Sequence, residues 1–234
     1  ENLKWLGITH DEFYRQSEHK DEHAKAIQKL IGDNFAYVSK EPSKDDPSRE
    51  VEIVRFKNKG TVVTFVDQLR GEITVDTTDL GDFVIARSLA EPIHHLAVVV
   101  DDANAGVTLA MRGEDLLSNT PRQILIQEAL GLSRPQYVHL PLILAPDRTK
   151  LSKRKHATSI GDYRLNGYVP EAMTNFLAFL GWSPGTDEEV FTLEQLIERF
   201  SLDQIHKSGA IFNEEKLRWF NREHLLRLEQ ETFS

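Results

Sequence analysis

The sequence predicts an α/β fold, with a parallel, doubly wound sheet followed by a helical region. Three observations predict it. Alternating strand patterns fill residues 51–87, strand and helix patterns alternate over 95–144, and helical spacing recurs from 170 to 225. The chain has 234 residues, of which 40% are hydrophobic, so it is long enough for one large domain or two small ones.

The first part of the chain predicts a helix followed by a group of strands. Residues 20–32 carry apolar side chains at helical spacing between charges. Residues 39–50 are polar, contain two prolines and predict a loop. Apolar and polar residues then alternate in four segments joined by short turns, which predicts strands at 51–57, 61–67, 71–77 and 82–87.

The middle of the chain predicts a parallel sheet. Residues 95–100 are continuously apolar after the first and predict a buried strand, and a second short strand is expected at 107–111. Capping side chains and a proline within 118–121 predict a helix that ends near Gly131. A third strand at 138–144 follows. Because such sheets bind ligands beyond the carboxyl ends of their strands, we expect the site there.

The remainder predicts helices. Pro170 begins a helix whose apolar stripe stops at Gly181. Thr192 and Gln195 have the spacing of a capping box at the start of another helix. Asn213 is placed to cap a final helix that carries apolar residues at helical spacing.

Composition excludes several classes of site. The chain has no cysteine, which excludes disulfides, thiolate metal sites and cysteine nucleophiles, and which fits a reducing cytoplasm. No apolar run approaches the length of a membrane span, so we expect no membrane partner. A net charge of -9 argues against a nonspecific nucleic-acid coat but leaves room for a local basic face.

The clearest basic cluster follows the third strand, where five cations lie within eight residues. Lys150 and Lys153 can stabilise the charge that a triphosphate gains when a carboxylate attacks its α-phosphorus. Ser152 can bind a phosphate or shape the loop. Arg154 and Lys155 can instead contact a nucleic-acid backbone. Taken alone, such a short motif is more often a solvated basic turn, because short motifs recur by accident.

Arg112 follows a predicted strand at the expected ligand edge. An arginine there can hold a carboxylate through two parallel hydrogen bonds, and a salt bridge to Glu114 or Asp115 is the equal alternative. The two acidic residues could act as general acid and base or bind a metal. We favour a third role, in which they orient a neighbouring arginine.

Two adjacent pairs in the sequence resemble metal ligands. His94 and His95 would point to opposite faces of a strand, so they cannot share one ion, and we expect one of them to be structural or to face a substrate. Asp101 and Asp102 could bind magnesium or simply end the strand.

Together these motifs resemble bacterial glutamyl-tRNA synthetase, a class I aminoacyl-tRNA synthetase. The resemblance covers nearly the whole chain, and its specificity lies in the order and spacing of the motifs. It is carried by Arg112-Gly113-Glu114-Asp115, Ser118-Asn119-Thr120-Pro121-Arg122-Gln123, Lys150-Leu151-Ser152-Lys153-Arg154 (a version of the "KMSKS" loop), 176–182, 212–219, 3–7 and 14–18.

The resemblance implies a reaction in which L-glutamate and ATP, with Mg²⁺ bound through ATP and no zinc, form glutamyl-adenylate. The glutamyl group then moves to the 3′ end of tRNA(Glu). The implied glutamate-binding residues are Arg112, His94 and Val98. The implied ATP-binding residues, with Lys150 and Lys153 as the catalytic ones, are Lys150, Leu151, Ser152, Lys153 and Arg154. The residues expected to orient groups or to contact tRNA are Glu114, Asp115, Arg154 and Lys155.

The resemblance also implies a division of the chain. Residues 1–25 would end the first Rossmann half, 26–92 would be the insertion that meets the tRNA acceptor end, 93–149 the second half, and 150–234 the KMSKS-type loop with a helical stem-contact region. The family's His-Ile-Gly-His-type signature and its anticodon-binding domain are missing from the sequence. We therefore expect a middle segment of a longer, monomeric, cytoplasmic enzyme, inactive by itself.

The expected glutamate pocket departs from the family pattern. His94 stands where tyrosine is usual, Val98 where asparagine is frequent, and Leu109 and Leu116 where histidine is common. These departures leave two alternatives open: a noncatalytic tRNA-binding descendant, or a glutaminyl-type relative.

Overall fold

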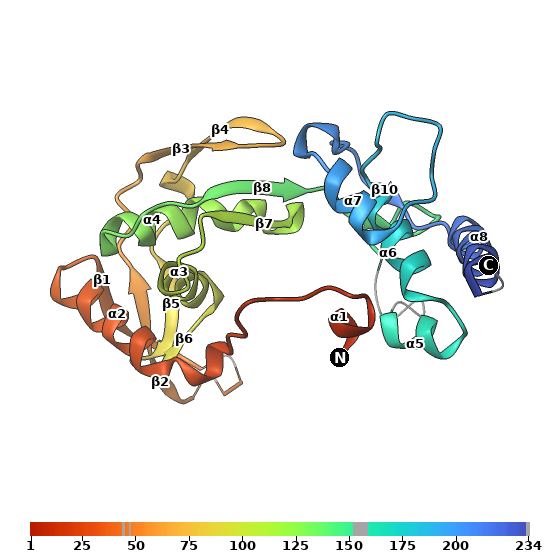
Figure 1. Cartoon of the computed structure of the whole chain (residues 1–234). Coiled ribbons are helices and arrows are strands. Elements are labelled where there is room, and N and C mark those ends of the chain that lie inside the picture. The colour runs from red at the N-terminus through yellow and green to blue at the C-terminus, as the bar shows by residue number, and fades with distance from the viewer. Residues whose placement is uncertain (44, 47, 152–158, 233–234) are drawn as a thin grey trace. The chain divides into compact units, whose positions relative to one another are not determined.

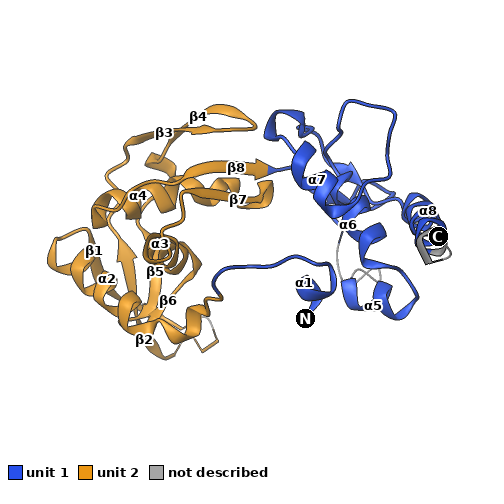
Figure 2. Ribbon diagram, in the orientation of Figure 1, with its two compact units in different colours: residues 1–12, 140–234 blue, residues 13–139 orange. Residues whose placement is uncertain are grey.

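The structure, a computed structural model, consists of two compact units (Figures 1 and 2). We call residues 13–139 the sheet unit, and residues 1–12 together with 140–234 the helical unit. The predicted α/β class is confirmed, because strands and helices alternate along the sheet unit. The structure describes residues 1–43, 45–46, 48–151 and 159–232.

The sheet unit begins with 3-10 helix η1 (Gln16–Glu18) and with α2 (Lys20–Gly32), which confirms the helix predicted at 20–32. An antiparallel sheet follows, in the order β1-β2-β5-β6, with strands at Ala36–Pro42, Glu50–Phe56, Phe83–Ser88 and Glu91–Pro92.

The loop predicted at 39–50 is wrong in its first part. Strand β1 continues to Pro42, which lies opposite Glu50 of β2. Strand β1 is an edge strand, and at an edge polar side chains and a proline without an N–H are tolerated.

The second sheet of this unit has the order β4-β3-β8-β7. Strands β3 and β4 form an antiparallel hairpin, whereas β3 pairs in parallel with β8 through Asp67 and Tyr137. The sheet is therefore mixed. It contains a parallel pair, but that pair includes β3, which comes from the segment before the predicted parallel sheet. The strands are Gly71–Asp76, Val62–Asp67, Gln136–Leu140 and Leu109–Gly113, with 3-10 helix η2 at Thr78–Leu80.

The strand predicted at 95–100 is wrong: these residues lie in helix α3 (His94–Asn104). A short apolar run fits a buried helix as well as a strand, and here helical hydrogen bonding continues beyond the run to Asn104. Packing against α2 and α4 overrides the β propensity of the valines. The buried side chains recur at helical intervals: Leu96, Ala97, Val99 and Val100.

Helix α4 (Thr120–Leu130) confirms the helix predicted from residues 118–121, although its N-cap residue Asn119 makes no side-chain capping hydrogen bond. Pro121 lies in its first turn, and Gly131 ends it in the left-handed region at φ 72°. The 3-10 helix η3 (Glu114–Asn119) connects it to β7. The core of the sheet unit lies between these helices and the strands and includes Ile27, Leu30, Phe56, Ile85, Leu96, Ile124 and Ile126.

The strand predicted at 138–144 is divided at Pro141, which has no N–H for a sheet ladder. Its first part is β8. Its second part, β9 (Ile143–Leu144), belongs to the helical unit and pairs in parallel with β10 (Ala210–Ile211).

The helical unit confirms the predicted caps. Pro170 begins α6, Thr192 and Gln195 form a capping box, and Asn213 Oδ1 accepts hydrogen bonds from the first-turn N–H groups of Glu215 and Lys216 at 2.9 and 3.1 Å. Aromatic rings of Phe176, Phe212 and Phe220 fill its core. Its helices are α1 (Asn2–Trp5), α5 (Ile160–Leu165), α6 (Pro170–Ala178), α7 (Leu193–Arg199), η4 (Leu202–Gln204) and α8 (Glu214–Thr232).

Candidate functional site

Arg112 lies in β7 of the sheet unit, where its guanidinium is half-buried and held from one side. Its Nε donates to His139 Nε2 at 3.2 Å. Its Nη2 donates to Thr120 Oγ1 at 3.0 Å and to Gln123 Oε1 at 2.6 Å. Burial lowers the pKa of Arg112 from its ordinary value. The result is a poorly hydrated cation with a fixed direction, which is what a carboxylate site needs.

The nitrogen Nη1 of Arg112 is treated differently. It makes no hydrogen bond to any residue in the part of the chain that the structure describes. The nitrogen Nη1 therefore keeps its two N–H donors available. The alternative of a salt bridge between Arg112 and Glu114 is not what organises this side chain, because Glu114 pairs with Arg70.

Glu114 and Asp115 lie in η3, immediately after β7. Glu114 ion-pairs with Arg70, whose Nε also donates to the backbone carbonyl of His139 at 3.2 Å. Glu114 thus orients an arginine, although not the one nearest in sequence. Asp115 lies against Gly113, where a Cβ would stand 2.6 Å from Asp115 Oδ1, so only glycine fits there without rearrangement.

His94, Val98 and Asp102 follow one another at intervals of four residues along α3, so they share one face of that helix. Burial raises the pKa of Asp102, while the charges of Arg112 and His94 lower it. Both side chains are therefore close to Asp102. The structure brings Arg112 and the face of α3 that carries His94 and Val98 into one region.

The two candidate metal pairs take other roles. His94 and His95 lie on a helix, so the argument from opposite strand faces does not apply; His95 faces inward, and burial lowers its pKa to about 4. Asp101 accepts hydrogen bonds from Gln16 Nε2 at 3.0 Å and from the buried His23 at 2.6 Å. Over residues 1–43, 45–46, 48–151 and 159–232, no three acidic or histidine side chains gather as a metal site.

The basic loop begins on a tight hairpin in the helical unit. Ala145 N donates to Thr149 O at 2.8 Å, and Asp147 Oδ1 accepts from the Thr149 N–H at 2.9 Å. Arg148 takes a left-handed φ of 63° at the turn. The backbones of Lys150 and Leu144 form an antiparallel β-bridge, and Lys150 is exposed at the end of the hairpin.

Only part of the predicted ATP-binding set can be placed. Leu151 continues the hairpin, and its N–H donates to Ile143 O at 3.0 Å. Four predicted residues lie outside the described residues: Ser152, Lys153, Arg154 and Lys155.

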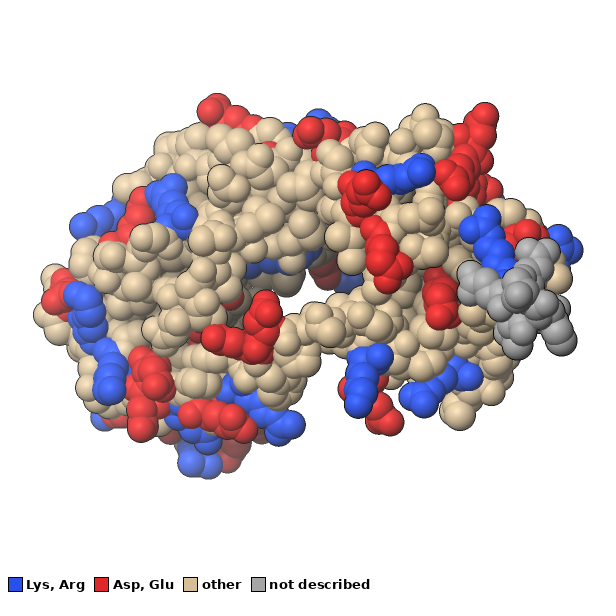
Figure 3. Space-filling model, in the orientation of Figure 1, with Lys and Arg blue, Asp and Glu red and all other residues tan. Residues whose placement is uncertain are grey.

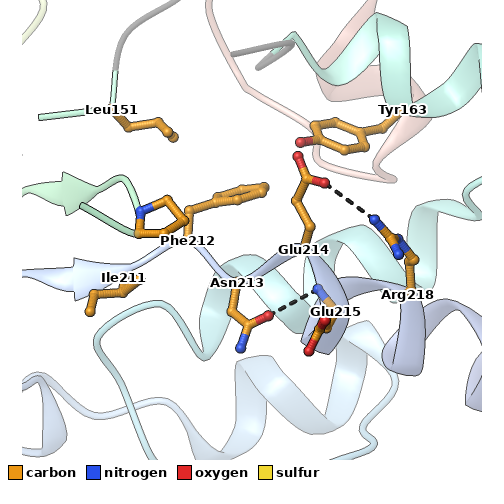
Figure 4. A pocket seen from close by; sticks show the side chains of 9 residues that line it. Leu151, Tyr163, Ile211, Phe212, Asn213, Glu214, Glu215 and Arg218 are labelled. Atoms are coloured by element: carbon orange, nitrogen blue, oxygen red, sulfur yellow. Dashed lines mark hydrogen bonds and ion pairs between the residues drawn. The ribbon is translucent and has the colours of Figure 1, made fainter. Parts of the chain in front are cut away.

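A cavity of about 440 Å³ opens beside this hairpin (Figure 4). In the figure the hydroxyl of Tyr163 and the carboxylate of Glu214 face one another, and Glu214 also pairs with Arg218 at 3.4 Å. Burial, and next the charge of Glu214, raises the pKa of Tyr163. The cavity is lined by Pro146, Leu151, Tyr163, Ile211, Phe212, Asn213, Glu214, Glu215 and Arg218.

Surface charge is mixed. On the face drawn in Figure 3, Lys and Arg side chains are scattered among Asp and Glu side chains, and those drawn in colour do not merge into one basic field. None of the helices that the structure describes is both long enough and apolar enough to cross a bilayer.

The sequence patterns did not identify the groups that hold Arg112. Asp67, His139, Thr120 and Gln123 are buried polar residues of the sheet unit. One signal was present: Asp67 occupies an inward position in the alternation of β3, after Val63 and Phe65. A carboxylate at a core position of a strand indicates a buried partner.

Comparison with known proteins gives the family. The sequence profile described as "tRNA synthetases class I (E and Q), catalytic domain" matches residues 1–46 and 43–219. The chain belongs to this family. The family resemblance and the class I synthetase fold, both inferred from the sequence, are thereby confirmed.

Individual class I synthetases are similar over most of the chain. The glutamate–tRNA ligase of Carboxydothermus hydrogenoformans is 44% identical over 94% of this chain and 55% of its own length. That of Aquifex aeolicus is 43% identical over 94% and 54%. This chain therefore spans about half the length of the relatives it matches.

A solved structure gives the same result for the fold. A glutamate tRNA ligase from Elizabethkingia meningosepticum, crystallised in complex with its amino acid, superposes with a TM-score of 0.87. It is 27% identical, and the match covers 99% of this chain and 59% of that one. A glutamate–tRNA synthetase from Elizabethkingia anophelis gives a TM-score of 0.85 at 28% identity, covering 96% and 59%.

Proposed function

We propose that this chain is part of a glutamate–tRNA ligase. It would activate L-glutamate with ATP to glutamyl-adenylate and transfer the glutamyl group to the 3′ end of tRNA(Glu). The observation that carries the proposal is the half-buried Arg112, held by three side chains and presenting two unengaged N–H donors. Relatives that bear the name glutamate–tRNA ligase, at up to 44% identity, support it.

Arg112 would bind a carboxylate of glutamate through Nη1, in an environment where a charge-assisted hydrogen bond is strong. His94 lies exposed at the first turn of α3, with Val98 one turn further on. His94 would donate a hydrogen bond to the same substrate, and Val98 would limit its space. Glu114 would act indirectly, through Arg70.

ATP would lie at the basic loop, with Mg²⁺ bound through its phosphates and no zinc. Lys150 and Lys153 would be the catalytic residues, acting by charge stabilisation and positioning without a covalent intermediate. The other residues of this phosphate site would be Leu151, Ser152 and Arg154. The hairpin that presents Lys150 supports this role, because it fixes where the loop starts.

The tRNA would be the third substrate. Residues 26–92 would meet its acceptor end, and 150–234 its stem, with Arg154 and Lys155 on the backbone and Asp115 as a further residue that contacts the tRNA or orients a neighbouring group. Strands β1, β2, β5 and β6 form a sheet of their own within 26–92, which supports a separate task for that segment. We further propose residues 1–25 and 93–149 as the Rossmann parts of a monomeric, cytoplasmic enzyme.

Glutamate-dependent ATP–pyrophosphate exchange, with tRNA present, tests this function. It is measured on this chain alone and on the chain joined to the amino-terminal segment of a relative. We expect exchange in the joined protein and its loss in Lys153→Ala. Exchange by the short chain alone would show that the ATP site is misplaced. A folded joined protein that binds tRNA but shows no exchange would favour a noncatalytic tRNA-binding role instead.

A further inference from the structure

We propose that Asp67 and His139 are positioning residues, which aim the guanidinium of Arg112 at a carboxylate by fixing His139 as its neutral Nδ1–H tautomer. The proposal rests on the proposed function for the identity of the carboxylate. It concerns residues that do not touch the substrate themselves.

Asp67 is the fixed end of this arrangement. It is 1% exposed, and its Oδ1 accepts the N–H groups of Leu69 and Arg70 at 3.1 and 2.9 Å. Its Oδ2 accepts the N–H of His139 at 3.0 Å and is 2.7 Å from His139 Nδ1. Four neighbouring nitrogens thus surround a fully buried carboxylate. Such a carboxylate is held in place by the donors that surround it.

The hydrogen bonds determine which nitrogen of His139 carries the proton. Both oxygens of Asp67 already accept backbone N–H groups, so Asp67 acts as an acceptor and Nδ1 of His139 donates to it. The guanidinium of Arg112 only donates, so Nε2 must accept from its Nε. A protonated imidazole would leave two cationic donors facing each other. Burial, the largest influence, lowers the pKa of His139 and therefore keeps the ring neutral.

The remaining neighbours agree with this assignment. The hydroxyl of Thr120 lies 3.2 Å from His139 Nε2 and accepts from Arg112 Nη2 at 3.0 Å, so it can donate to the ring while accepting from the arginine. Gln123 turns its Oε1 toward Arg112 and leaves its own Nε2 buried without a partner among the described residues. An unsatisfied buried donor is unfavourable, so orienting Arg112 outweighs that cost here.

These contacts determine where the nitrogen Nη1 of Arg112 points. Nε and Nη2 are both engaged, so the plane of the guanidinium is fixed and Nη1 points away from its holders. Arg112 is only half-buried and Nη1 is not one of the buried unpaired atoms among the described residues, so this nitrogen can be reached from solvent. We infer that Arg112 is already held in the orientation that a ligand requires. Less side-chain entropy is then lost when the ligand binds.

The first test reads the tautomer directly in this chain. Long-range ¹H–¹⁵N spectra of His139 are expected to show a protonated Nδ1 and a bare Nε2 from about pH 6.5 to pH 8. The Nε–H of Arg112 is expected to exchange slowly with solvent. An Nε2–H tautomer, or rapid exchange at Arg112 Nε, would overturn the proposal whether or not glutamate binds.

The second test separates the two bonds of His139 with near-isosteric variants. In His139→Gln an amide oxygen can reach the place of Nε2 and still accept from Arg112, whereas in His139→Asn an amide N–H can reach Asp67 but nothing reaches Arg112. His139→Gln loses the bond to Asp67, and His139→Asn loses the contacts of Nε2 with Arg112 and Thr120, so the unfolding free energy of each variant is measured beside its affinity. We expect L-glutamate to bind His139→Asn at least about tenfold more weakly than His139→Gln, by analogy with the loss of one charge-assisted bond. Equal affinities would make the histidine merely structural and overturn the proposal.

The third test changes Asp67, which contacts His139 on the side of the ring away from Arg112. In Asp67→Asn an amide N–H facing the ring would favour the Nε2–H tautomer, which sets two donors against each other at Arg112. We expect that tautomer in the spectra, together with a loss of glutamate affinity of about tenfold or more. Val63→Ala, on the same strand and also buried, is the control for destabilisation and is expected to bind glutamate normally. Unchanged spectra and affinity in Asp67→Asn would contradict the positioning role.

Failure of the proposed function gives a different result. If wild-type chain, and wild-type chain joined to the amino-terminal segment of a relative, both fail to bind L-glutamate, the proposed substrate is wrong. The positioning of Arg112 is then decided by the tautomer and by the exchange of its Nε–H alone.

Discussion

Arg112 and Lys150 are cations of the same charge that the molecule treats in opposite ways. Arg112 is half-buried in the sheet unit and donates hydrogen bonds to three side chains. Lys150 is exposed at the end of a hairpin in the helical unit. A guanidinium that is held in one orientation and poorly hydrated can select a ligand by the geometry of its acceptor atoms. An exposed ammonium group contributes mainly its charge. The difference predicts that one residue determines which amino acid binds and that the other assists a polyphosphate.

The largest expected effect tests whether the two regions are stable independently. Phe220 is fully buried among the rings of the helical unit, so Phe220→Ala is expected to lower the free energy of unfolding of that unit by about 3–5 kcal/mol. Denaturant unfolding followed by signals from each unit measures it. We expect the spectrum of His139 to be unchanged in the mutant under native conditions; a shifted tautomer would show that the two regions are coupled.

The next effect concerns geometry at constant charge. Arg112→Lys keeps the cation but loses the planar fork, and Thr120, Gln123 and His139 lose their shared donor. We expect kcat/KM for glutamate in the exchange assay to fall about 100-fold, or about 2.7 kcal/mol. The KM for ATP should change little. An equal loss toward both substrates would mean that the variant has disturbed the whole sheet unit.

The pH dependence of stability is expected to follow the buried histidines of the sheet unit. Burial lowers the pKa of His95 to about 4, so between that value and the ordinary 6.5 the unfolded chain binds more protons than the folded one. Stability is therefore full above about pH 6.5 and is lost as the pH falls toward 4, by up to about 3 kcal/mol for this residue.

The variant His95→Leu isolates that contribution. The Nδ1 of His95 is buried without a partner among the described residues, so an apolar side chain is expected to cost little at neutral pH. Unfolding free energies at about pH 7 and about pH 5 measure the change. The variant should flatten the dependence, leaving the part due to His139, whose pKa burial also lowers. An unchanged slope would show that His95 is not responsible.

The smallest effect belongs to the exposed cation. Lys150→Ala is expected to reduce kcat/KM for ATP about tenfold, or about 1.4 kcal/mol, without changing the melting temperature. Because salt screens exposed charges, the loss should shrink as ionic strength rises. Lys40→Ala removes a comparably exposed lysine of β1 and serves as the control. A loss that is insensitive to salt would contradict the assignment of Lys150 as a solvated charge.

Local features of this fold could be predicted from the sequence, because their causes are local. The capping box of Thr192 and Gln195, the cap at Asn213 and the left-handed Gly131 each depend on a few consecutive residues. Helix α3 could not be assigned with the same certainty, since a short run rich in valine fits a strand or a buried helix equally well.

The residues of the candidate site could be predicted only in part, for a similar reason. Arg112 stands at the end of a strand, which is a local signal, and its importance could be inferred. Its support could not. Asp67 and His139 are 72 residues apart in sequence and meet only because β3 and β8 pair in parallel, and a hairpin from the preceding segment was not expected in that sheet. Contacts created by strand pairing leave little trace in either partner's own sequence.

The most direct measurement compares L-glutamate binding to three proteins prepared alike: the wild type, Arg112→Lys and Lys150→Ala, each joined to the amino-terminal segment of a relative. Titration calorimetry gives the three dissociation constants. The account predicts that Arg112→Lys loses most of its glutamate affinity and that Lys150→Ala keeps the wild-type value. Full affinity in Arg112→Lys with a loss in Lys150→Ala would contradict it, because recognition of the amino acid would then depend on the exposed cation and not on the positioned one.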